Sequence, residues 1–421
     1  MRKRHVAVIT ATVATICATM GMVGRPAAAV SDGTQGVTAT TIRVGIPYVD
    51  VAAVKAVGVD IDWGNVPHAF TAIIDGLNAH GGINGRKIVP FIVAVNPTGT
   101  AAAASTCTQL TQDDSVFVAI APLMPDCYLQ RGVPVVGSVL QGAGVHTLAQ
   151  NFGLTPPQSA YDPLQLSVYA KQDVFKGKKV AIFAGAVTDQ SEIPVVQSAL
   201  HGLHVHVVTT AVDSAPQGDL AASNQQVTSI VQRFQSAGVN EVVAVGSGSA
   251  VWPQGLSAIQ SAYNPPWVAT SESEFTGDVA GDNNPTYLKK VVTSTPLTPP
   301  AAIWNNGGTQ RCVQAVKKAY PADHINAYEA SLPASQATWM GVEIACADMA
   351  LFAAIAKAAG PHLTVSSFVH AGYGLRNLTL PGSSTTISFG PNRPYALGPV
   401  YMVRYDPATK ALVYATKSSN S

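Results

Sequence analysis

Charged side chains are scarce in this sequence. Asp, Glu, Lys and Arg make up 12% of the 421 residues, and the formal net charge is +1. This balance offers no electrostatic attraction for nucleic acid, so no nucleic-acid partner is predicted. Low charge combined with 47% hydrophobic residues also argues against a disordered chain.

Signatures of catalysis and of metal binding are missing as well. There is no G-x-S-x-G elbow and no H-E-x-x-H motif, and the GRKI sequence at 85–88 lacks the Ser or Thr of a phosphate-binding loop. The HGLHVH sequence at 201–206 has a possible ligand spacing, but no neighbouring cysteine or convincing acid completes a metal site. We therefore predict no enzymatic activity, no metal and no cofactor.

A long apolar run stands at the start of the chain. Basic residues at positions 2–4 precede an apolar stretch over 6–23, and an Ala-Ala-Ala sequence ends at Ala29. This order is typical of a secretory signal peptide, so residues 1–29 are predicted to be cleaved near Ala29.

No later segment resembles a membrane span. The longest apolar candidate, 334–359, contains Glu343, Asp348 and Lys357, whose charges are costly in lipid, so it is predicted to be an alanine-rich core helix. Lipid attachment at Cys17 is not predicted, because an isoleucine precedes it where a small residue is needed. The mature protein is expected to be secreted into the periplasm or cell-wall space and not to span the membrane.

Four cysteines remain in the mature chain: Cys107, Cys127, Cys312 and Cys346. An even number in an exported protein suggests two disulfides, for which sequence alone allows three connectivities. Pairing nearest neighbours, Cys107 with Cys127 and Cys312 with Cys346, closes the shortest loops and is favoured. Buried free thiols are the alternative.

The pattern of the chain predicts an α/β protein with two doubly wound lobes. Roughly 390 residues remain after signal removal, which suits two domains. Short apolar runs alternate with helix-period segments, and the alternation restarts near Pro156, which argues for parallel sheets covered by helices on both faces. A ligand would then lie between the carboxyl ends of the strands of the two lobes. The predicted strands are 42–48, 87–95, 116–121, 133–136, 179–183, 205–209, 241–245 and 267–269, with a strand-rich end over 386–416, and the predicted helices are 66–79, 100–112, 158–172, 193–203, 224–237 and 256–263.

The LNAHGGINGRKI sequence at 77–88 is the most distinctive stretch. It combines a helix that ends in glycines with an Asn-Gly turn leading into a strand. It resembles the type I periplasmic solute-binding proteins, in particular the branched-chain amino acid (Leu/Ile/Val) receptors of ABC transporters. Further similar features follow in the same order: Cys107, the strand at 116–120, Cys127, GVPVV at 132–136 and GKKVAI at 177–182.

The resemblance implies two lobes joined by a hinge of three crossovers, near Pro156, at 271–277 and at 379–389. It also implies that Cys107 and Cys127 form the first disulfide of the family. The N-terminal lobe is then expected to comprise 38–156 and 274–380, and the C-terminal lobe 157–273 and 381–421.

The same resemblance nominates two ligand-binding residues. Trp63, just before the first long helix, is expected to provide an aromatic wall, and Glu272, after the strand at 267–269, to bind an ammonium group. A core tryptophan and an exposed loop carboxylate are the respective alternatives.

Departures from the family pattern favour a more apolar solute than a plain amino acid. In the amino acid receptors, Ser and Thr hydroxyls after the third and fourth strands bind the ligand carboxylate. The corresponding loops are PLMPDCY at 122–128 and GSVLQ at 137–141, where only Ser138 has an aliphatic hydroxyl and Met124 and Leu140 are apolar. Because an unpaired buried charge is costly, we expect an apolar solute with a polar or cationic end near Glu272.

Loops after strands of the second lobe add further candidates. Asp189 lies in VTDQ at 187–190, and Ser247, Ser249 and Trp252 lie in GSGSAVW at 246–252. A Gly-Ser-Gly-Ser sequence alone is also typical of an ordinary loop.

The resulting hypothesis is a receptor that captures a small-molecule solute for an ABC importer whose permease and ATPase are separate proteins. One alternative is a sensor of the same fold that presents its closed form to a signalling partner. An exported enzyme or structural wall protein is a further alternative.

Overall fold

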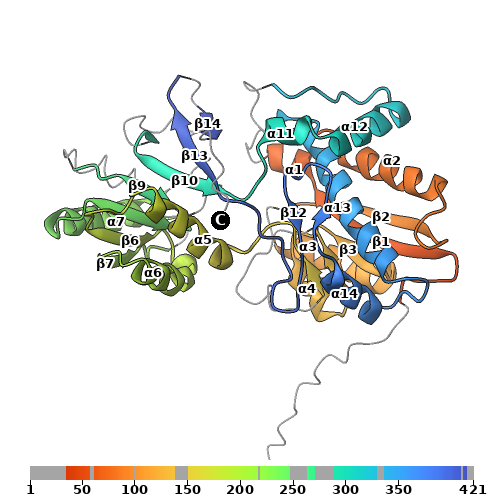
Figure 1. Cartoon of the computed structure of the whole chain (residues 1–421), viewed down its shortest axis with the longest axis horizontal. Helices are drawn as coiled ribbons and strands as arrows, with labels where there is room; N and C mark the ends of the chain where they lie inside the picture. The colour runs from red at the N-terminus through yellow and green to blue at the C-terminus, as the bar shows by residue number, and fades with distance from the viewer. Residues whose placement is uncertain are drawn as a thin grey trace, which may run out of the picture.

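The computed structural model describes residues 35–56, 61–97, 100–137, 150–216, 219–246, 263–270, 288–329, 336–408 and 411–414. Figure 1 shows two α/β lobes, each with its own sheet. The predicted fold class, parallel sheets covered by helices in two lobes, is confirmed. Within the described ranges, no helix is long and apolar enough to cross a membrane.

The first lobe is built on a five-stranded sheet in the order β2-β1-β3-β4-β5. All neighbouring strands are parallel. Ile42, Val44 and Ile46 alternate along β1 and are buried, which places one apolar face of the central strand against helices. The strands are β1 (Thr41–Val49), β2 (Lys87–Val95), β3 (Val118–Ile120), β4 (Val135–Val136) and β5 (Asn151–Phe152).

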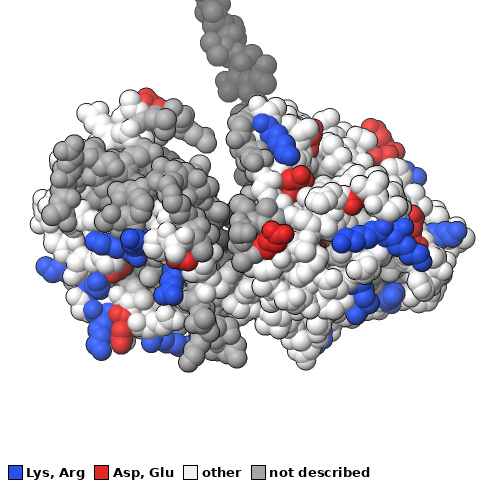
Figure 2. Space-filling view, turned by 90° about the horizontal axis from the view of Figure 1, so that it is seen from above, with Lys and Arg blue, Asp and Glu red and all other residues white. Residues whose placement is uncertain are grey.

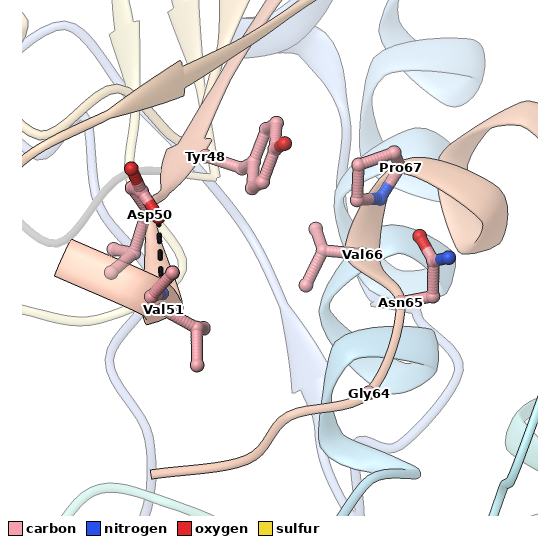
Figure 3. Close-up of a pocket in the computed structure, with 9 residues that line it drawn as sticks. Tyr48, Asp50, Val51, Gly64, Asn65, Val66 and Pro67 are labelled. Carbon is pink, nitrogen blue, oxygen red and sulfur yellow. Dashed lines mark hydrogen bonds between the residues drawn. The ribbon is translucent and has the colours of Figure 1, made fainter. Parts of the chain in front are cut away.

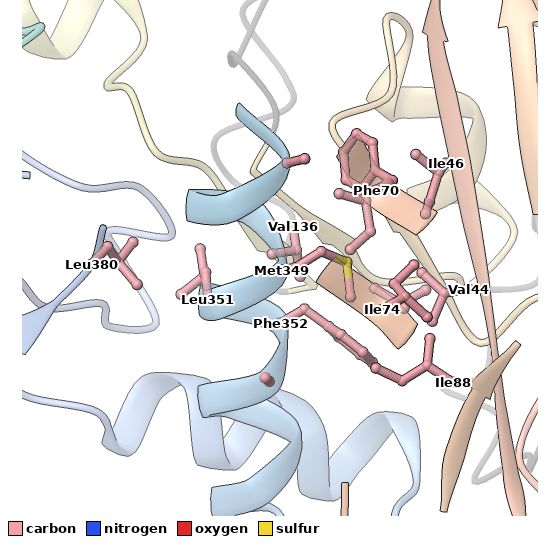
Figure 4. Close-up of a cluster of buried hydrophobic side chains, with 14 of the residues drawn as sticks. Val44, Ile46, Phe70, Ile74, Ile88, Val136, Met349, Leu351, Phe352 and Leu380 are labelled. Atoms are coloured by element: carbon pink, nitrogen blue, oxygen red, sulfur yellow. The ribbon is translucent and has the colours of Figure 1, made fainter. Parts of the chain in front are cut away.

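Helices from both ends of the chain cover this sheet. Helix α13 (Met340–Ala358) packs against α2 (Val66–Ala79), so a late segment completes the core of an early one. In Figure 4, Met349 and Phe352 of α13 lie between α13 and the strands, in the same cluster as Val44. The other helices of this lobe are α1 (Val51–Ala56), α3 (Thr100–Thr108) with the π-helical turn η1 (Gln109–Asp113), α4 (Pro125–Gln130), α11 (Pro300–Trp304), α12 (Gly307–Ala319) and α14 (Val365–Gly374).

The second lobe contains a seven-stranded sheet in the order β14-β13-β10-β9-β8-β6-β7. Strands β6 to β10 are parallel, and β13 and β14 are antiparallel additions at one edge. The strands are β6 (Val180–Ala184), β7 (Val207–Val212), β8 (Glu241–Val245), β9 (Trp267–Ala269), β10 (Val291–Thr295), β13 (Tyr401–Asp406) and β14 (Ala411–Tyr414). The helices described in this lobe are α5 (Gln158–Lys171), η3 (Val187–Glu192, a 3-10 helix), α6 (Ile193–Gly202) and α7 (Leu220–Ser236).

Successive residues of the central strands are buried on opposite faces of this sheet. Phe183 packs in a cluster with Phe234 of α7, whereas Ile182 packs in a cluster with Leu166 of α5 and Leu200 of α6. Burial on both faces explains why β6 and residues 242–245 of β8 are continuous apolar runs rather than alternating ones.

The chain crosses between the lobes three times within the described ranges. The first crossover lies between β5 and α5, as predicted near Pro156. The third passes beside the first: the Gly153 N–H donates to Pro394 O (3.0 Å) and Gly153 O accepts from the Ala396 N–H (2.8 Å). The second lies between β10 and Ile303, which packs in the first-lobe core.

Two crossover positions differ from the predicted ones. The predicted boundary between residues 273 and 274 assigns β10 to the first lobe, but β10 pairs with β9 and β13 in the second sheet. Phe389 still packs in the first-lobe core, so the third crossover lies beyond 379–389. The polar VVTST sequence of β10 explains why the strand is missed. Residues 256–262 of a predicted helix and residues 271–277 themselves lie outside the described residues, so the rest of the predicted division of the chain stays a prediction.

A short hairpin precedes the third crossover. It pairs β11 (Leu378–Thr379) with β12 (Thr386–Ile387) in antiparallel orientation.

Two disulfides join helices of the first lobe. Cys107 of α3 is bonded to Cys127 of α4, and Cys312 of α12 to Cys346 of α13. This is the nearest-neighbour pairing favoured by the sequence.

Candidate ligand-binding site

A pocket of about 370 Å³ lies in the first lobe where β1 ends and α2 begins. Residues 48–52 line it from the strand side and residues 64–67 from the helix side. Figure 3 shows Tyr48 on the strand side, with Val66 and Pro67 of α2 across from it. Ligands of doubly wound sheets bind beyond the carboxyl ends of the strands, so this pocket is the candidate site.

Local hydrogen bonds hold both walls of the pocket. Asp50 Oδ1 accepts from the N–H groups of Ala52 (3.0 Å) and Ala53 (3.2 Å) and so begins α1. Asn65 Oδ1 accepts from the His68 N–H (3.2 Å) and caps α2. Gly64 has a φ of +74°, and a Cβ there would lie 2.6 Å from Thr338 O, so only glycine fits this close approach.

Trp63 directly precedes the pocket-lining Gly64. Its carbonyl accepts from the Gly341 N–H (3.1 Å), and its partly buried side chain packs against the first-lobe core. Trp63 is thus next to the pocket lining in the chain, and its side chain packs against the core without being one of the lining residues. Contact between Trp63 and a ligand stays a prediction.

The carboxyl ends of β3 and β4 carry the next candidates. Met124 is half-buried and occupies the N-cap position of α4, directly before Pro125. Gly137 follows β4, and a Cβ on it would lie 2.2 Å from Oδ1 of Asp348. Burial raises the pKa of the Asp348 carboxyl well above its usual range, which favours the neutral acid.

In the second lobe, Asp189 lies on η3, the segment that follows β6. A Cβ on Gly246, the residue after β8, would lie 2.4 Å from Cγ of Asp189. The fold thus brings Asp189 against the start of the loop that contains two predicted serines. Burial, together with the Asp189 carboxylate, raises the pKa of Glu192 to about 7.

The other predicted ligand-binding residues lie outside the described ranges, so their positions stay predictions. They are Ser138, Leu140, Ser247, Ser249, Trp252 and Glu272.

Sequence reasoning missed the residues that line the pocket. Tyr48 lies at the end of β1, Asp50 follows that strand, and Asn65 directly precedes α2. The sequence does indicate the start of the helix, because Asn65 followed two positions later by Pro67 is typical of a helix N-terminus. What the pattern could not indicate is that these two stretches line one open pocket.

Charged groups do not dominate the face of the molecule drawn in Figure 2. On the face drawn in Figure 2, basic and acidic side chains are interspersed among uncharged ones on both lobes. Among the residues that the structure describes, no group of three or more His, Cys, Asp or Glu is arranged to hold a metal ion.

Comparisons with solved structures identify the fold. No protein-family model and no curated protein matches the sequence. An ABC transporter substrate-binding protein from Desulfitobacterium hafniense in complex with Leu is similar at a TM-score of 0.61 and 11% identity, over 89% of this chain and 100% of that one. A branched-chain amino acid transporter substrate-binding protein from Streptococcus pneumoniae in complex with isoleucine is similar at a TM-score of 0.56 and 15% identity, over 89% and 100% of the two chains.

A third solved structure has a different named ligand class. It is a fatty acid ABC transporter substrate-binding protein from Thermomonospora curvata, with a TM-score of 0.56 and 15% identity over 92% of this chain and 94% of that one. Together these likenesses show that the chain has the type I periplasmic binding protein fold, as its sequence resemblance implied. Similarity at such low identity establishes the fold and leaves the ligand to other arguments.

Proposed function

We propose that this protein is an extracytoplasmic solute-binding protein that captures a small molecule between its lobes for a separate ABC permease and ATPase. The observation that carries the proposal is the pocket at the carboxyl end of β1, in a chain that shares its fold with substrate-binding proteins over 89% of its length. A solute that contacts both lobes stabilises their closed arrangement, which is the form a permease recognises.

We further propose that the solute is more apolar than a plain amino acid. Between β3 and α4, Leu123 and Met124 are half-buried apolar residues. Pro122 and Pro125 flank them and have no N–H to donate to a carboxylate. The structural similarity to a protein named for fatty acids is compatible with such a ligand.

Export is proposed from the first 29 residues of the sequence. A signal peptidase is expected to release a mature protein that begins at Val30. Intact-mass analysis of the protein from the culture medium or cell-wall fraction checks this expectation, and a mass that retains residues 1–29 contradicts it.

A thermal-shift screen of the mature protein tests the proposed function. Amino acids, amides, aromatic acids and lipid-like solutes are offered separately, and a solute that binds only the native state at a hundredfold excess over its Kd adds about 2.7 kcal/mol of stability. We expect the larger apolar solutes to raise the melting temperature. A shift with branched-chain amino acids alone overturns the proposed ligand class, and no shift with any solute overturns the receptor function.

Trp63→Ala tests the position of the site. We expect the variant to weaken binding of the solute found by the screen about tenfold or more, because a buried aromatic contact contributes about 1.4 kcal/mol or more. Trp304→Ala is the matched control, since Trp304 is also partly buried against the first-lobe core but does not adjoin the pocket lining in the chain. Isothermal titration measures the affinity of both variants for the solute. An equal loss of affinity in the two variants contradicts the placement of the site beside Trp63.

A further inference from the structure

A buried polar network lies inside the second lobe, where α5 packs beside β9 and β10. Asp162 of α5 is 0% exposed, and its Oδ1 accepts from Nε2 of Gln158 (2.5 Å) and of Gln165 (2.9 Å). The same two amide nitrogens donate to Thr270 O, at 2.5 Å and 3.0 Å. The amide nitrogen of each glutamine therefore donates to two acceptors.

The other side of Gln165 extends the network to β10. Gln165 Oε1 accepts from Ser294 Oγ (3.0 Å), and the Tyr169 hydroxyl donates to Ser294 Oγ (2.7 Å). Tyr161 is the other phenol in this network. Asp162 thus has a rigid position, set by side chains that are themselves held.

One carboxyl oxygen of Asp162 accepts no hydrogen bond from the described residues. Its Oδ2 is buried and has no hydrogen-bond partner among the described residues, and the same holds for Oε2 of Glu192. Glu192 is the last residue of η3 and precedes α6, and α6 packs against α5. A buried carboxylate oxygen without a donor is costly, whereas a protonated carboxyl can donate to a neighbouring one.

The charged groups that the described ranges place close to these two carboxyl groups are themselves carboxylates. The Asp189 carboxylate on η3 is close enough to Glu192 to raise the pKa of the Glu192 carboxyl, and the Tyr169 phenol near Asp162 stays neutral because burial raises its pKa. No salt bridge of the described ranges includes Asp162 or Glu192. Burial, with the Glu192 carboxylate as a smaller cause, raises the pKa of Asp162 to about 8, although hydrogen bonds from Gln158 and Gln165 oppose the rise.

We infer that Asp162 and Glu192 together retain a proton at neutral pH, and that this protonated pair positions η3, and with it Asp189, at the carboxyl edge of the second sheet. Two such groups titrate as a pair rather than as separate acids. They are positioning residues, and the inference rests on the proposed function only for the role of Asp189.

The direction of the pH dependence follows from the raised pKa values. The folded pair holds its proton up to about pH 7 or 8, whereas the unfolded chain loses it near its ordinary value. The contribution to stability is therefore fully present below the unfolded pKa and is lost as the pH rises through the folded pKa. Loss of the proton is expected to loosen η3 first, because it is a short exposed segment at the end of a strand.

Hydrogen exchange of the full-length mature protein without ligand tests the inference. After correction for the intrinsic pH dependence of exchange, we expect protection of residues 187–193 to fall about tenfold or more between pH 6 and pH 9. Asp162→Asn keeps an oxygen that accepts from Gln158 and Gln165 and replaces Oδ2 by a permanent donor. In this variant the fall is expected to disappear.

Two further variants make the result decisive. Glu192→Gln replaces the partner and is expected to reduce the pH dependence as well, even if Asp162→Asn folds poorly. Asp173→Asn is the matched control, because Asp173 is exposed and pairs with the exposed Lys176, and its profile is expected to follow the parent protein. Equal protection at both pH values in the parent, or an unchanged fall in both pair variants, overturns the inference. This readout needs no solute, so its failure is distinct from a failure of the proposed function.

Discussion

Gly82→Ala is expected to destabilise the first lobe by about 3 kcal/mol or more. Gly82 has a φ of +70°, and a Cβ there would lie 1.9 Å from Arg86 O and 2.7 Å from the Arg86 carbonyl carbon. The tight turn after α2 must therefore open, and with it the entry into β2 beside the central strand β1. Both the strained φ and the backbone collision contribute to the loss.

Gly81→Ala separates the two causes. Gly81 has a φ of +92°, but no atom lies within 4 Å of a Cβ built on it. Its substitution is expected to cost about 1–2 kcal/mol, the cost of a left-handed conformation alone. Urea unfolding of the two variants and the parent measures the difference. Equal losses would show that the turn relaxes freely and that the close approach to Arg86 is unimportant.

Removing the Cys107–Cys127 disulfide is expected to cost about 3 kcal/mol, because the cross-link closes a loop of sequence separation 20 and so limits the unfolded chain. The double variant Cys107→Ala, Cys127→Ala is preferred over serine, since Cys107 is 0% exposed and a buried hydroxyl adds its own penalty. Denaturant unfolding of the oxidised mature protein gives the loss.

The parent protein under strong reduction is the control for this double variant. Reduction also opens Cys312–Cys346, which spans a longer sequence separation of 34, so the reduced parent is expected to be less stable than the double variant. A double variant as stable as the oxidised parent would mean that the first disulfide is absent from the mature protein or contributes nothing to its stability.

Several elements could be predicted to the residue. The predicted bounds of α2, β2, β8 and β9 match those in the structure. Each has a strong local signal: α2 has a capping Asn65 and a glycine end, and the strands are apolar runs bounded by turns. The local preferences of these segments agree with their tertiary surroundings, so tertiary contacts did not change the predicted bounds.

Short elements were harder to predict. Helices α1 and α4 have six residues each and no amphipathic period to detect, and both begin at the carboxyl end of a strand. The polar strand β10 could not be predicted from a run of apolar residues. Its Ser294 is buried because it forms hydrogen bonds with Gln165 and Tyr169. Such burial depends on partners more than a hundred residues away.

By itself, the sequence determined the fold class, the order of the main strands and helices, and the pairing of the cysteines by proximity along the chain. These features rest on periodicity, turns and spacing, which are local properties. Only the tertiary structure decided that Tyr48 and Val66 line one pocket, and that Asp162 loses all contact with water. The physical reason is the same in both cases: cavities and desolvation arise from distant segments that pack together, and no local pattern records which segments will meet.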